Sequence, residues 1–594
     1  MAGTLAAGHP SRSEPRGAKL RRVVDRGRKG LARLDRLIES RPWFAPALIV
    51  VAGALVTVPL ALFGFVFGDI IHLVWAKHFS DQLWAGNLYP RWLLDMNSGL
   101  GSPTFYFYGP VSYYITSLFF LVLPYHGYGW LQVGLSAALA SVGSGLAAYL
   151  WLRQGSSRRA ASIAAALYTW LPYHLRIDHV ERFAFAEYWG FVWMPLSLYY
   201  VTRLLAGHRR SIAGLAITYA LLLMTHPPTA LLFGCIPFLY ACSLAVEVRS
   251  YKPLVQVAAA MVLGSALAAI YLLPALTTQS SASIPDMFLA DVFYANSFLF
   301  VTLPSFAGEP IWFQAWLAQM TKLTFVAGSI AALLAFTGLW GPRRPERIFW
   351  SGIVVFSLMM MHPLSAPLWR AIPLLQRVQF PWRFHILVCL ATLALIAYAI
   401  DALPVARMQR WRSIAFALAM LVIGLDGLYT LKVVRWDVVH GQRATVREAD
   451  LIKNYPEYRT KWTPRHVYTP ERVKELSAVT PPVQTVSGPG QAWIQKWSPT
   501  EIQIGSNAAA DMQVQVKQFY YPTWTATLEN GEACATSASP EGLLVINLPP
   551  GRREVSLSIE AVGPGLLGQR ISLMAVVVTL GLFLGLRDSA PKKA

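Results

Sequence analysis

Acidic, basic and histidine side chains gather in a few short segments of this sequence, and their types could support group transfer from a phosphate. The candidate residues are, in chain order, Asp69, His72, Arg91, Asp178, Glu181, Arg182, Glu187, His226, Arg377 and Arg383. A carboxylate can act as a general base on a hydroxyl group. Arginine side chains can hold a phosphate or pyrophosphate through paired hydrogen bonds. Together these groups suit the transfer of a group from a phosphate-bearing lipid.

Each of these segments also has a structural interpretation. Asp69 is of a type that caps helix N-termini, and the 176–182 cluster could be an ion-pair network that ties loops together. Arg383 follows a tryptophan, as an arginine at a membrane interface would, and His226 could be structural. The aromatic run Phe105–Tyr108 is typical of an interfacial belt, and it could also stack on a sugar or line a polyprenyl groove.

The composition indicates a membrane protein. The chain has 594 residues, of which 55% are hydrophobic and 14% are charged, against about 25% charged residues in an average soluble protein. Apolar runs of about 20 residues, long enough to cross a hydrocarbon core about 30 Å thick, recur along most of the chain. These features exclude a soluble enzyme, a disordered chain and a collagen-like chain. The sequence contains neither a Walker A motif nor a strand-linked G-x-G-x-x-G, which argues against an ATP-driven pump.

About twelve segments are predicted to span the membrane. They centre on residues 44–67, 130–152, 160–174, 188–205, 212–225, 229–246, 254–273, 323–340, 347–361, 384–402, 413–430 and 568–586. A further apolar run, 110–124, is shorter and ends at Pro124, so we expect it to be re-entrant or to lie along the surface. Basic loops alternate strictly if this run does not cross and the N-terminus is cytoplasmic. The segments assigned to the cytoplasm then carry the whole net charge of +20.

In this topology the candidate site residues fall in the external loops or at the external ends of spans. Carboxylates near a bilayer surface are costly unless they are paired or wetted. Their clustering with arginine and histidine therefore predicts a polar cavity at the outer face of the membrane.

The largest external segment, 431–567, is predicted to be a β-rich domain. Apolar residues alternate around Val514, Leu544 and Val555, as in half-buried strands, and Asn530-Gly531 is a hairpin turn signal. The predicted divisions of the chain are a basic cytoplasmic segment (1–43), a transmembrane domain (44–430), the β-rich domain (431–567), and a final transmembrane helix with a cytoplasmic tail (568–594).

Several motifs resemble a bacterial membrane-protein family labelled 6-pyruvoyl-tetrahydropterin synthase-related. They are the stretches Asp69–Trp92, Gly99–Pro110, Glu181–Glu187, Gln379–Phe384, Tyr521–Trp524 and Asn530-Gly531. In the third of these, Phe183 stands where the family usually has a glycine. The chain also resembles the GT-C superfamily of polytopic glycosyltransferases. The resemblance lies in three features that follow one another: an acidic residue at the end of the first span, a long first loop with a non-crossing helix, and a second acidic loop.

The resemblance implies a GT-C-like fold and an enzyme whose donors are sugars linked to polyprenyl phosphate. By similarity, Asp69 would be the catalytic base of an inverting transfer. Asp178 or Glu181 would be a second acidic residue in the site, for acceptor placement or for a divalent cation, and Arg182 and Arg383 would hold the lipid phosphate. The sequence shows no full metal-ligand set, so a cation such as Mg²⁺ or Mn²⁺ is compatible but not required.

We therefore expect a mainly α polytopic membrane enzyme, a GT-C type glycosyltransferase of the bacterial inner membrane with both termini cytoplasmic and a periplasmic active site. It would move a sugar from a polyprenyl-phosphate-linked donor to a hydroxyl of a glycan, lipid or protein acceptor, with no nucleic-acid partner. The β-rich domain would either hold the acceptor or cap the site. Two alternatives stay open, namely a transporter or flippase of lipid-linked glycans and a non-catalytic assembly factor of the cell envelope.

Overall fold

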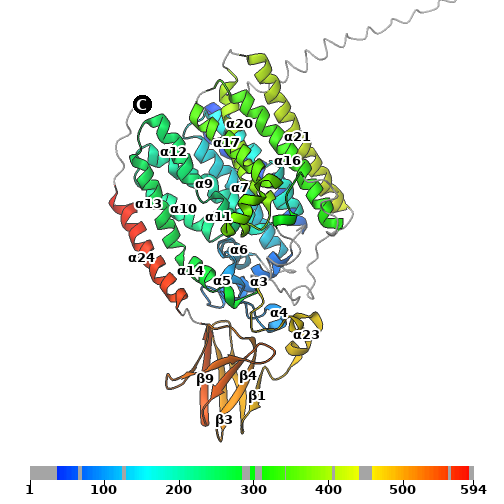
Figure 1. Ribbon diagram of the computed structural model, residues 1–594, viewed down its shortest axis with the longest axis vertical. Helices are drawn as coiled ribbons and strands as arrows, with labels where there is room; N and C mark the ends of the chain where they lie inside the picture. The colour runs from blue at the N-terminus through cyan, green and yellow to red at the C-terminus, as the bar shows by residue number, and fades with distance from the viewer. Residues whose placement is uncertain are drawn as a thin grey trace, which may run out of the picture.

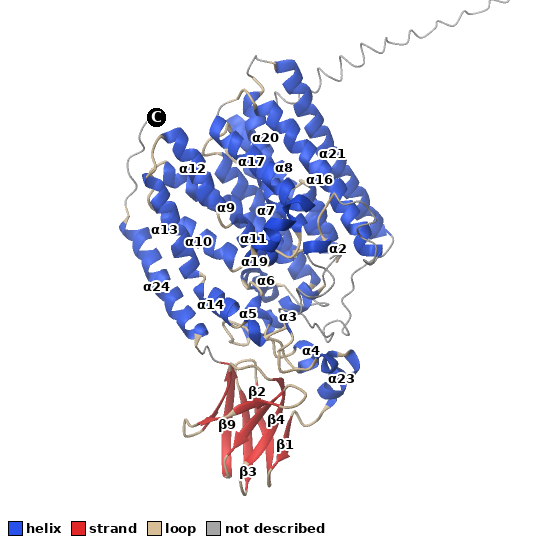
Figure 2. Ribbon diagram, viewed as in Figure 1, coloured by secondary structure: helices blue, strands red, loops and turns tan. Residues whose placement is uncertain are grey.

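The chain folds into a body of long helices with two β-sheets at one end (Figure 1, Figure 2). The computed structural model describes residues 36–64, 70–123, 129–283, 294–300, 311–341, 343–404, 408–439, 458–559 and 563–586. The last helix, α24 (Pro564–Gly585), begins next to the sheets and runs back along the edge of the helical body (Figure 1).

Seven helical stretches in the described part of the chain are long and apolar enough to cross a membrane. They are formed by α2 (Phe44–Phe63), α7 (Trp130–Leu152), α11 with α12 (Pro227–Phe233 and Ile236–Val248), α16 (Ile311–Gly338), η6 with α20 (Pro381–Phe384 and His385–Ala402), α21 (Gln409–Val439) and α24. Two bent pairs raise the number to nine: α13 with α14 (Lys252–Leu267 and Ala269–Thr277), bent by 70°, and α17 with the segment containing α18 (Arg344–Met361 and Ala366–Ala371), bent by 85°.

The other three predicted spans correspond to α8 (Arg158–Tyr168), α9 (Phe185–Leu205) and α10 (Ser211–Leu223). α8 has 11 residues and α10 has 13, so at about 1.5 Å per residue each is shorter than the hydrocarbon core. α9 is longer but carries Glu187 and Arg203 near its two ends. The mainly helical architecture with apolar, membrane-length helices is confirmed, whereas the number of twelve spans stays a prediction.

Small residues allow the first two long helices to pack closely. A Cβ atom on Gly53 of α2 would come within 3.0 Å of the Val142 backbone on α7, and one on Gly134 would come within 2.8 Å of Ala61. Close backbone approach of this kind is typical of helices that associate in membranes. α20, in contrast, is buried on all sides, as expected for a helix that is apolar all round.

The first loop, between α2 and α7, contains four short helices. They are α3 (Ile71–Trp84), α4 (Met96–Gly99), α5 (Thr104–Phe107) and α6 (Val111–Val122). The 12 residues of α6 extend about 18 Å. α6 is thus shorter than the hydrocarbon core, as α8 and α10 are, and the non-crossing position of the 110–124 run stays a prediction.

The C-terminal region forms two antiparallel sheets with strand orders β1-β4-β8-β7 and β2-β3-β9-β5-β6. The strands are β1 (Val483–Ser487), β2 (Gly490–Trp497), β3 (Ile502–Ala508), β4 (Met512–Phe519), β5 (Trp524–Leu528), β6 (Ala533–Cys534), β7 (Thr536–Ala538), β8 (Leu543–Leu548) and β9 (Gly551–Ile559). The predicted strands around Val514, Leu544 and Val555 are confirmed. Asn530-Gly531 joins the antiparallel strands β5 and β6, with Gly531 at φ +84°.

A buried glutamine connects the sheets to the first loop. Gln518 on β4 accepts a hydrogen bond from the Trp92 indole at 2.8 Å. It donates to the carbonyl oxygens of Leu94 and Gly99 at 3.2 and 2.7 Å. Gly101, at φ +86°, allows this contact because a Cβ atom there would lie within 2.5 Å of both Trp92 and Gln518. The first loop and the sheets therefore pack as one unit.

Candidate functional site

A cavity of about 860 Å³ lies among the helices, and its lining comes from α3, α5, α9 to α11, α13, α14 and the segments before α9 and α20. Its volume is within the range of about 300–1,000 Å³ that is typical of small-molecule pockets. Six residues that the sequence analysis singled out line it together, namely His72, Arg182, Glu187, His226, Arg377 and Arg383.

Glu187, near the start of α9, is the centre of the charged part of the cavity. Its side chain is 1% exposed, and the Tyr173 hydroxyl donates to Oε1 at 2.7 Å. Arg182 donates to both carboxylate oxygens at 3.3–3.4 Å, and Arg383 Nε lies 3.3 Å from Oε2. A buried carboxylate is tolerated when it is paired and hydrogen-bonded. Glu187 therefore holds two guanidinium groups beside the cavity.

Asp178 lies behind Arg182 and does not line the cavity. It is fully buried, and Arg182 donates to its Oδ1 at 2.8 Å. Burial raises the pKa of the Asp178 carboxyl well above its usual range, and Glu187 adds to this rise while Arg182 opposes it. Burial lowers the pKa of the Arg182 guanidinium, but Glu187 and Asp178 outweigh this effect and raise it. Asp178 thus orients Arg182, which stays charged.

Asp178 lies on η1 (Tyr173–Glu181), a π-helix of nine residues. Such helices are rare and are often found at functional sites. Two residues beyond its end, Phe183 adopts φ +48°, a left-handed conformation that residues other than glycine adopt at a cost. This is the position at which the resembling family usually has glycine. The turn from η1 into α9 therefore requires a positive φ, which explains that preference.

Arg383 comes from the 3₁₀ turn η6, directly before α20. It donates to the Val378 carbonyl at 2.7 Å, and its guanidinium lies 5.2 Å from the centroid of the Phe380 ring. Gln379, in the same segment, lines the cavity and has φ +74°. Residues other than glycine with positive φ therefore occur in both segments that supply the arginines. Backbone strain of this kind is often found at functional sites.

The two histidines of the cavity wall are held by hydroxyl groups. His72 Nδ1 lies 2.8 Å from the Tyr113 hydroxyl, and His226 Nδ1 lies 2.7 Å from Thr229 Oγ1. A hydrogen bond at one ring nitrogen fixes the orientation of the ring. Both rings are therefore held in place on the wall of the cavity.

The rest of the cavity wall is mostly apolar, and its largest part comes from α10, α11, α13 and α14. This part includes Tyr219, Leu223, Leu231, Met261, Leu272 and Leu276. Among the described residues of the wall, the only formal charges belong to three arginines and one glutamate. The cavity therefore combines a positively charged part with an apolar part.

Glu181 does not line the cavity, although only two residues separate it from Asp178. It accepts a hydrogen bond from Gln319 on α16 and lies 3.8 Å from Arg176 Nε. Arg176 in turn pairs with Asp426 on α21 at 3.0 Å. The structure thus places Glu181 in a second ion-pair cluster on another side of η1.

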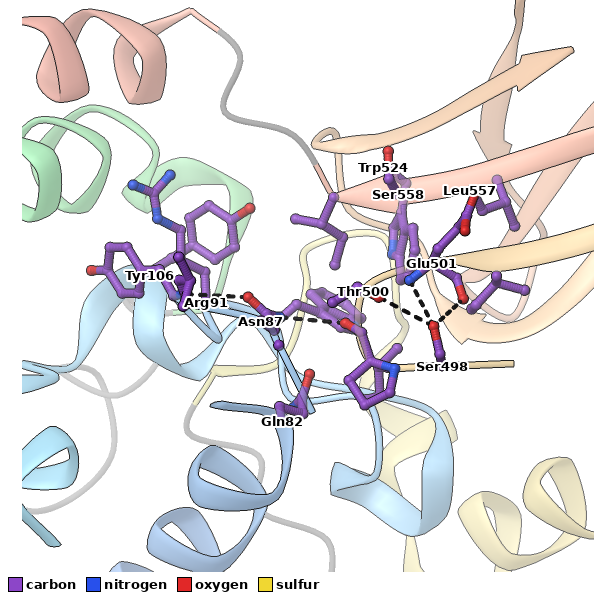
Figure 3. A pocket seen from close by; sticks show the side chains of 18 of the residues that line it. Gln82, Asn87, Arg91, Tyr106, Ser498, Thr500, Glu501, Trp524, Leu557 and Ser558 are labelled. Atoms are coloured by element: carbon purple, nitrogen blue, oxygen red, sulfur yellow. Dashed lines mark hydrogen bonds between the residues drawn. The ribbon is translucent and has the colours of Figure 1, made fainter. Parts of the chain in front are cut away.

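Two other predicted site residues are not seen at this cavity. Arg91 lines a different pocket, between the first loop and the sheets (Figure 3), where it donates to the Ile270 carbonyl at 3.1 Å. Asp69 lies outside the described residues. Ile71, two positions after it, lines the cavity.

Three residues at the site were not singled out in the sequence. Tyr173 hydrogen-bonds Glu187, and Gln379 and Tyr458 line the cavity. Gln379 belongs to one of the motifs on which the family resemblance rests, and that motif could have identified it. No pattern around Tyr173 or Tyr458 distinguishes them from other tyrosines in the chain.

The described residues do not fit a divalent cation. Within the described ranges, no three His, Cys, Asp or Glu side chains gather as a metal-ligand set. Both oxygens of Glu187 are already taken by Tyr173 and two arginines. Glu187 is therefore a partner of arginine in this structure.

A family model identifies the family. The model of the 6-pyruvoyl-tetrahydropterin synthase related domain, described as a membrane protein, matches residues 105–434. Because the match covers more than half of the chain, the chain belongs to this family of membrane proteins.

One solved structure with a similar arrangement is the arabinofuranosyltransferase AftD from mycobacteria. The two share 16% sequence identity, with a TM-score of 0.42, and the match covers 64% of this chain and 26% of the AftD chain. This chain therefore spans about a quarter of the length of that protein. No curated protein matches the sequence.

Proposed function

We propose that this protein is a membrane glycosyltransferase that moves a sugar from a polyprenyl-phosphate-linked donor to an acceptor hydroxyl. The observation that carries the proposal is the cavity, which joins a wall bearing Arg182, Arg377 and Arg383 to an apolar wall from α10, α11, α13 and α14. A phosphate that is attached to a lipid needs both kinds of surface. In the proposed orientation the site faces the periplasm, in the bacterial inner membrane.

The arginines are suited to hold the phosphate of the donor. Guanidinium groups offer paired donors in the geometry that phosphate oxygens accept. Glu187 already orients Arg182 and Arg383, at 3.3 Å each. Donors that are oriented in advance stabilise developing charge without the cost of rearranging. They would therefore stabilise the phosphate as the sugar leaves it.

The apolar wall is suited to the lipid. Leucine, methionine and tyrosine side chains of α10, α11, α13 and α14 would pack on the first isoprene units of the donor. Burial of apolar surface contributes about 25 cal/mol per Å², so this wall supplies binding energy that does not depend on the identity of the sugar.

Asp69 is the proposed general base, and His72, three residues later, lines the cavity. Asp69 takes the proton of the acceptor hydroxyl, whose oxygen forms the new bond to the anomeric carbon of the sugar. The bond between that carbon and the phosphate oxygen breaks, and the polyprenyl phosphate leaves with the electron pair. Because a phosphate leaving group needs little protonation, one base and a cationic clamp suffice.

The first test replaces the proposed base and compares it with a matched carboxylate. Asp69→Asn and Asp81→Asn are expressed as full-length protein in cells that lack the native gene, and the envelope glycans are analysed by mass spectrometry. Asp81 lies on α3, in the same loop, but is 47% exposed and pairs with Lys77. Loss of a general base typically costs about 10²–10⁴ in rate, so we expect Asp69→Asn to lose the modification and Asp81→Asn to keep it.

The second test separates transfer from transport. The purified protein in lipid nanodiscs is given lipid-linked donor together with acceptor glycan, both extracted from the same cells, and the lipid products are measured. Transfer releases free polyprenyl phosphate, whereas transport leaves the lipid-linked glycan intact. Full glycan modification by Asp69→Asn would refute the assignment of the base, and an intact donor lipid would refute the transferase.

A further inference from the structure

A second pocket, of about 240 Å³, lies where the first loop meets the β-sheets (Figure 3). Its walls come from α3 and the loop after it, from the turn between β2 and β3, from β5 and β9, and from α24. This volume lies just below the about 300 Å³ at which pockets for drug-sized ligands begin. The pocket therefore suits a ligand of about the size of one sugar residue.

Two buried polar groups in this pocket indicate that it receives a ligand. Gln82 is 1% exposed, and neither Oε1 nor Nε2 has a hydrogen-bond partner among the described residues. Trp524 is 4% exposed, and its indole N–H likewise has no hydrogen-bond partner among the residues that the structure describes. Buried polar groups are normally hydrogen-bonded, because leaving them unsatisfied costs free energy. Both residues line the pocket, so a bound molecule would satisfy them.

The side chains around these two groups match the chemistry of a sugar. Figure 3 shows Gln82 and Asn87 on the side of the first loop, and Trp524 and Glu501 on the side of the strands. A sugar hydroxyl both donates and accepts, and a side-chain amide offers a donor and an acceptor in one plane. Aromatic rings supply flat apolar surfaces on which the C–H faces of a sugar can pack.

The charges in the pocket favour a neutral ligand. Among the described lining residues, Arg91 and Glu501 carry the only formal charges, and these are opposite. The Arg91 guanidinium lies 4.4 Å from the centroid of the Tyr89 ring and donates to a backbone carbonyl. The pocket therefore lacks the positive surplus of the cavity, and it fits a sugar better than a phosphate.

A single short helix separates the pocket from the cavity. In α5, Tyr106 lines the pocket, whereas the next residue, Phe107, lines the cavity. The Tyr106 hydroxyl is 2.7 Å from Thr523 Oγ1, and the Phe107 carbonyl accepts a hydrogen bond from Tyr271 at 2.7 Å. The wall between the two spaces is thus held from both sides.

We propose that this pocket is a binding subsite for a neutral sugar residue of the acceptor glycan, apart from the place of reaction. The assignment to the acceptor rests on the transferase proposed above. The prediction that the pocket binds a sugar does not depend on the transferase, and it can be tested without a transfer assay.

The test measures sugar binding by the full-length protein in lipid nanodiscs. The probes are the methyl glycosides of glucose, galactose, mannose and arabinose, followed by saturation-transfer NMR. Gln82→Leu removes the unsatisfied amide with little change in shape, and Trp524→Phe removes the unsatisfied indole N–H together with one ring. Trp493→Phe, on β2 and outside this pocket, is the matched control. We expect at least one glycoside to bind the wild-type protein and Trp493→Phe, and to bind the two pocket variants about tenfold more weakly, as loss of one hydrogen bond predicts.

Thermal unfolding of the same samples shows whether the variants are folded. Because the side-chain amide of Gln82 has no partner among the described residues, leucine should keep or raise the unfolding temperature. Absence of binding to the wild-type protein, or equal binding to Gln82→Leu, would overturn the inference. Polyprenyl phosphate, which would occupy the cavity, should leave glycoside binding unchanged, and displacement of the glycoside would also contradict the inference. Glycoside binding by a protein that transfers no sugar would refute only the proposed function.

Discussion

The π-helix η1 and the residue after it contribute to two ion-pair clusters of similar composition. The cavity cluster comprises Tyr173, Asp178, Arg182, Glu187 and Arg383. The closed cluster comprises Arg176, Glu181, Gln319 and Asp426. Arg182, Glu187 and Arg383 of the first cluster line the cavity, and no member of the second does. Similar side chains from one short segment therefore meet two different surroundings.

The difference shows that ion pairing alone does not identify a functional site. The closed cluster has one arginine for two carboxylates and joins η1 to α16 and α21. The cavity wall has three arginines for one glutamate among its described residues. A positive surplus beside a cavity favours a negatively charged ligand, whereas the ion pairs of the closed cluster lie away from this cavity and tie helices together.

The largest expected effect is a difference in transfer activity between variants of the two glutamates, one from each cluster. Glu187→Gln should lower transfer activity by about 100-fold, because both arginines lose the carboxylate that orients them and small misplacements are costly in catalysis. Glu181→Gln, the same change in the closed cluster, should leave activity nearly unchanged. Activity of membranes that contain equal amounts of each variant measures the difference. A similar loss in both variants would show that Glu181 also contacts the substrate.

Arg383 of the cavity cluster should affect lipid binding, whereas Arg176 of the closed cluster should affect stability. Arg383→Gln should weaken the binding of polyprenyl phosphate by about 10-fold to 100-fold, because a hydrogen bond to a charged group contributes about 1.5–3 kcal/mol. Arg176→Gln should leave that binding unchanged but lower the free energy of unfolding by about 3 kcal/mol, because Asp426 loses its cation. Lipid binding and thermal unfolding are measured on the same preparations. Loss of lipid binding in Arg176→Gln would remove the distinction between the clusters.

Asp178 predicts a dependence of stability on pH. Its pKa is raised in the folded protein, so the folded state binds the proton more tightly than the unfolded chain does. This contribution to stability is fully present below the usual Asp pKa of about 3.9, and it is lost as the pH rises through the raised pKa. Asp178→Asn cannot ionise, so its unfolding temperature should fall less with rising pH. Equal slopes in the two proteins would mean that Asp178 is ionised throughout.

The smallest expected effect concerns the backbone beside the cavity. Gln379→Gly should relieve the strain of a positive φ, which costs about 1–2 kcal/mol, but it adds about 0.5–1 kcal/mol of chain entropy. The net result should be a slight gain in stability. Gln376→Gly, three residues earlier on α19 (Pro373–Gln376), should instead lose about 1 kcal/mol. Thermal unfolding distinguishes the two, and a loss in both would show that Gln379 is not strained.

Local periodic patterns predict much of this fold. Hydropathy marks the long apolar helices, and alternation around Val514 and Leu544 marks two of the strands, because each pattern follows the period of its element. The distribution of Lys and Arg also predicts that the polar clusters lie on one side of the membrane. Six of the ten candidate site residues line one cavity, as expected if the same ends of several helices converge.

The places of Asp178 and Glu181 could not be predicted in this way. Residues three apart share a face in an α-helix, so the sequence favours a common environment for the two. The wider turn of the π-helix rotates them apart, and no sequence pattern marks such a turn. Gln518 is a similar case, because only the packing of distant segments makes it a buried connector.

The contact between Gln518 and the first loop also fixes an order of assembly. Trp92 and Gln518 are 426 residues apart in the chain. At about 5–20 residues per second, synthesis reaches Gln518 tens of seconds after the first loop has emerged. During that time the Trp92 indole and the carbonyl groups of Leu94 and Gly99 lack their partner. The loop that borders both the cavity and the pocket can therefore complete its packing only after the C-terminal strands have been made.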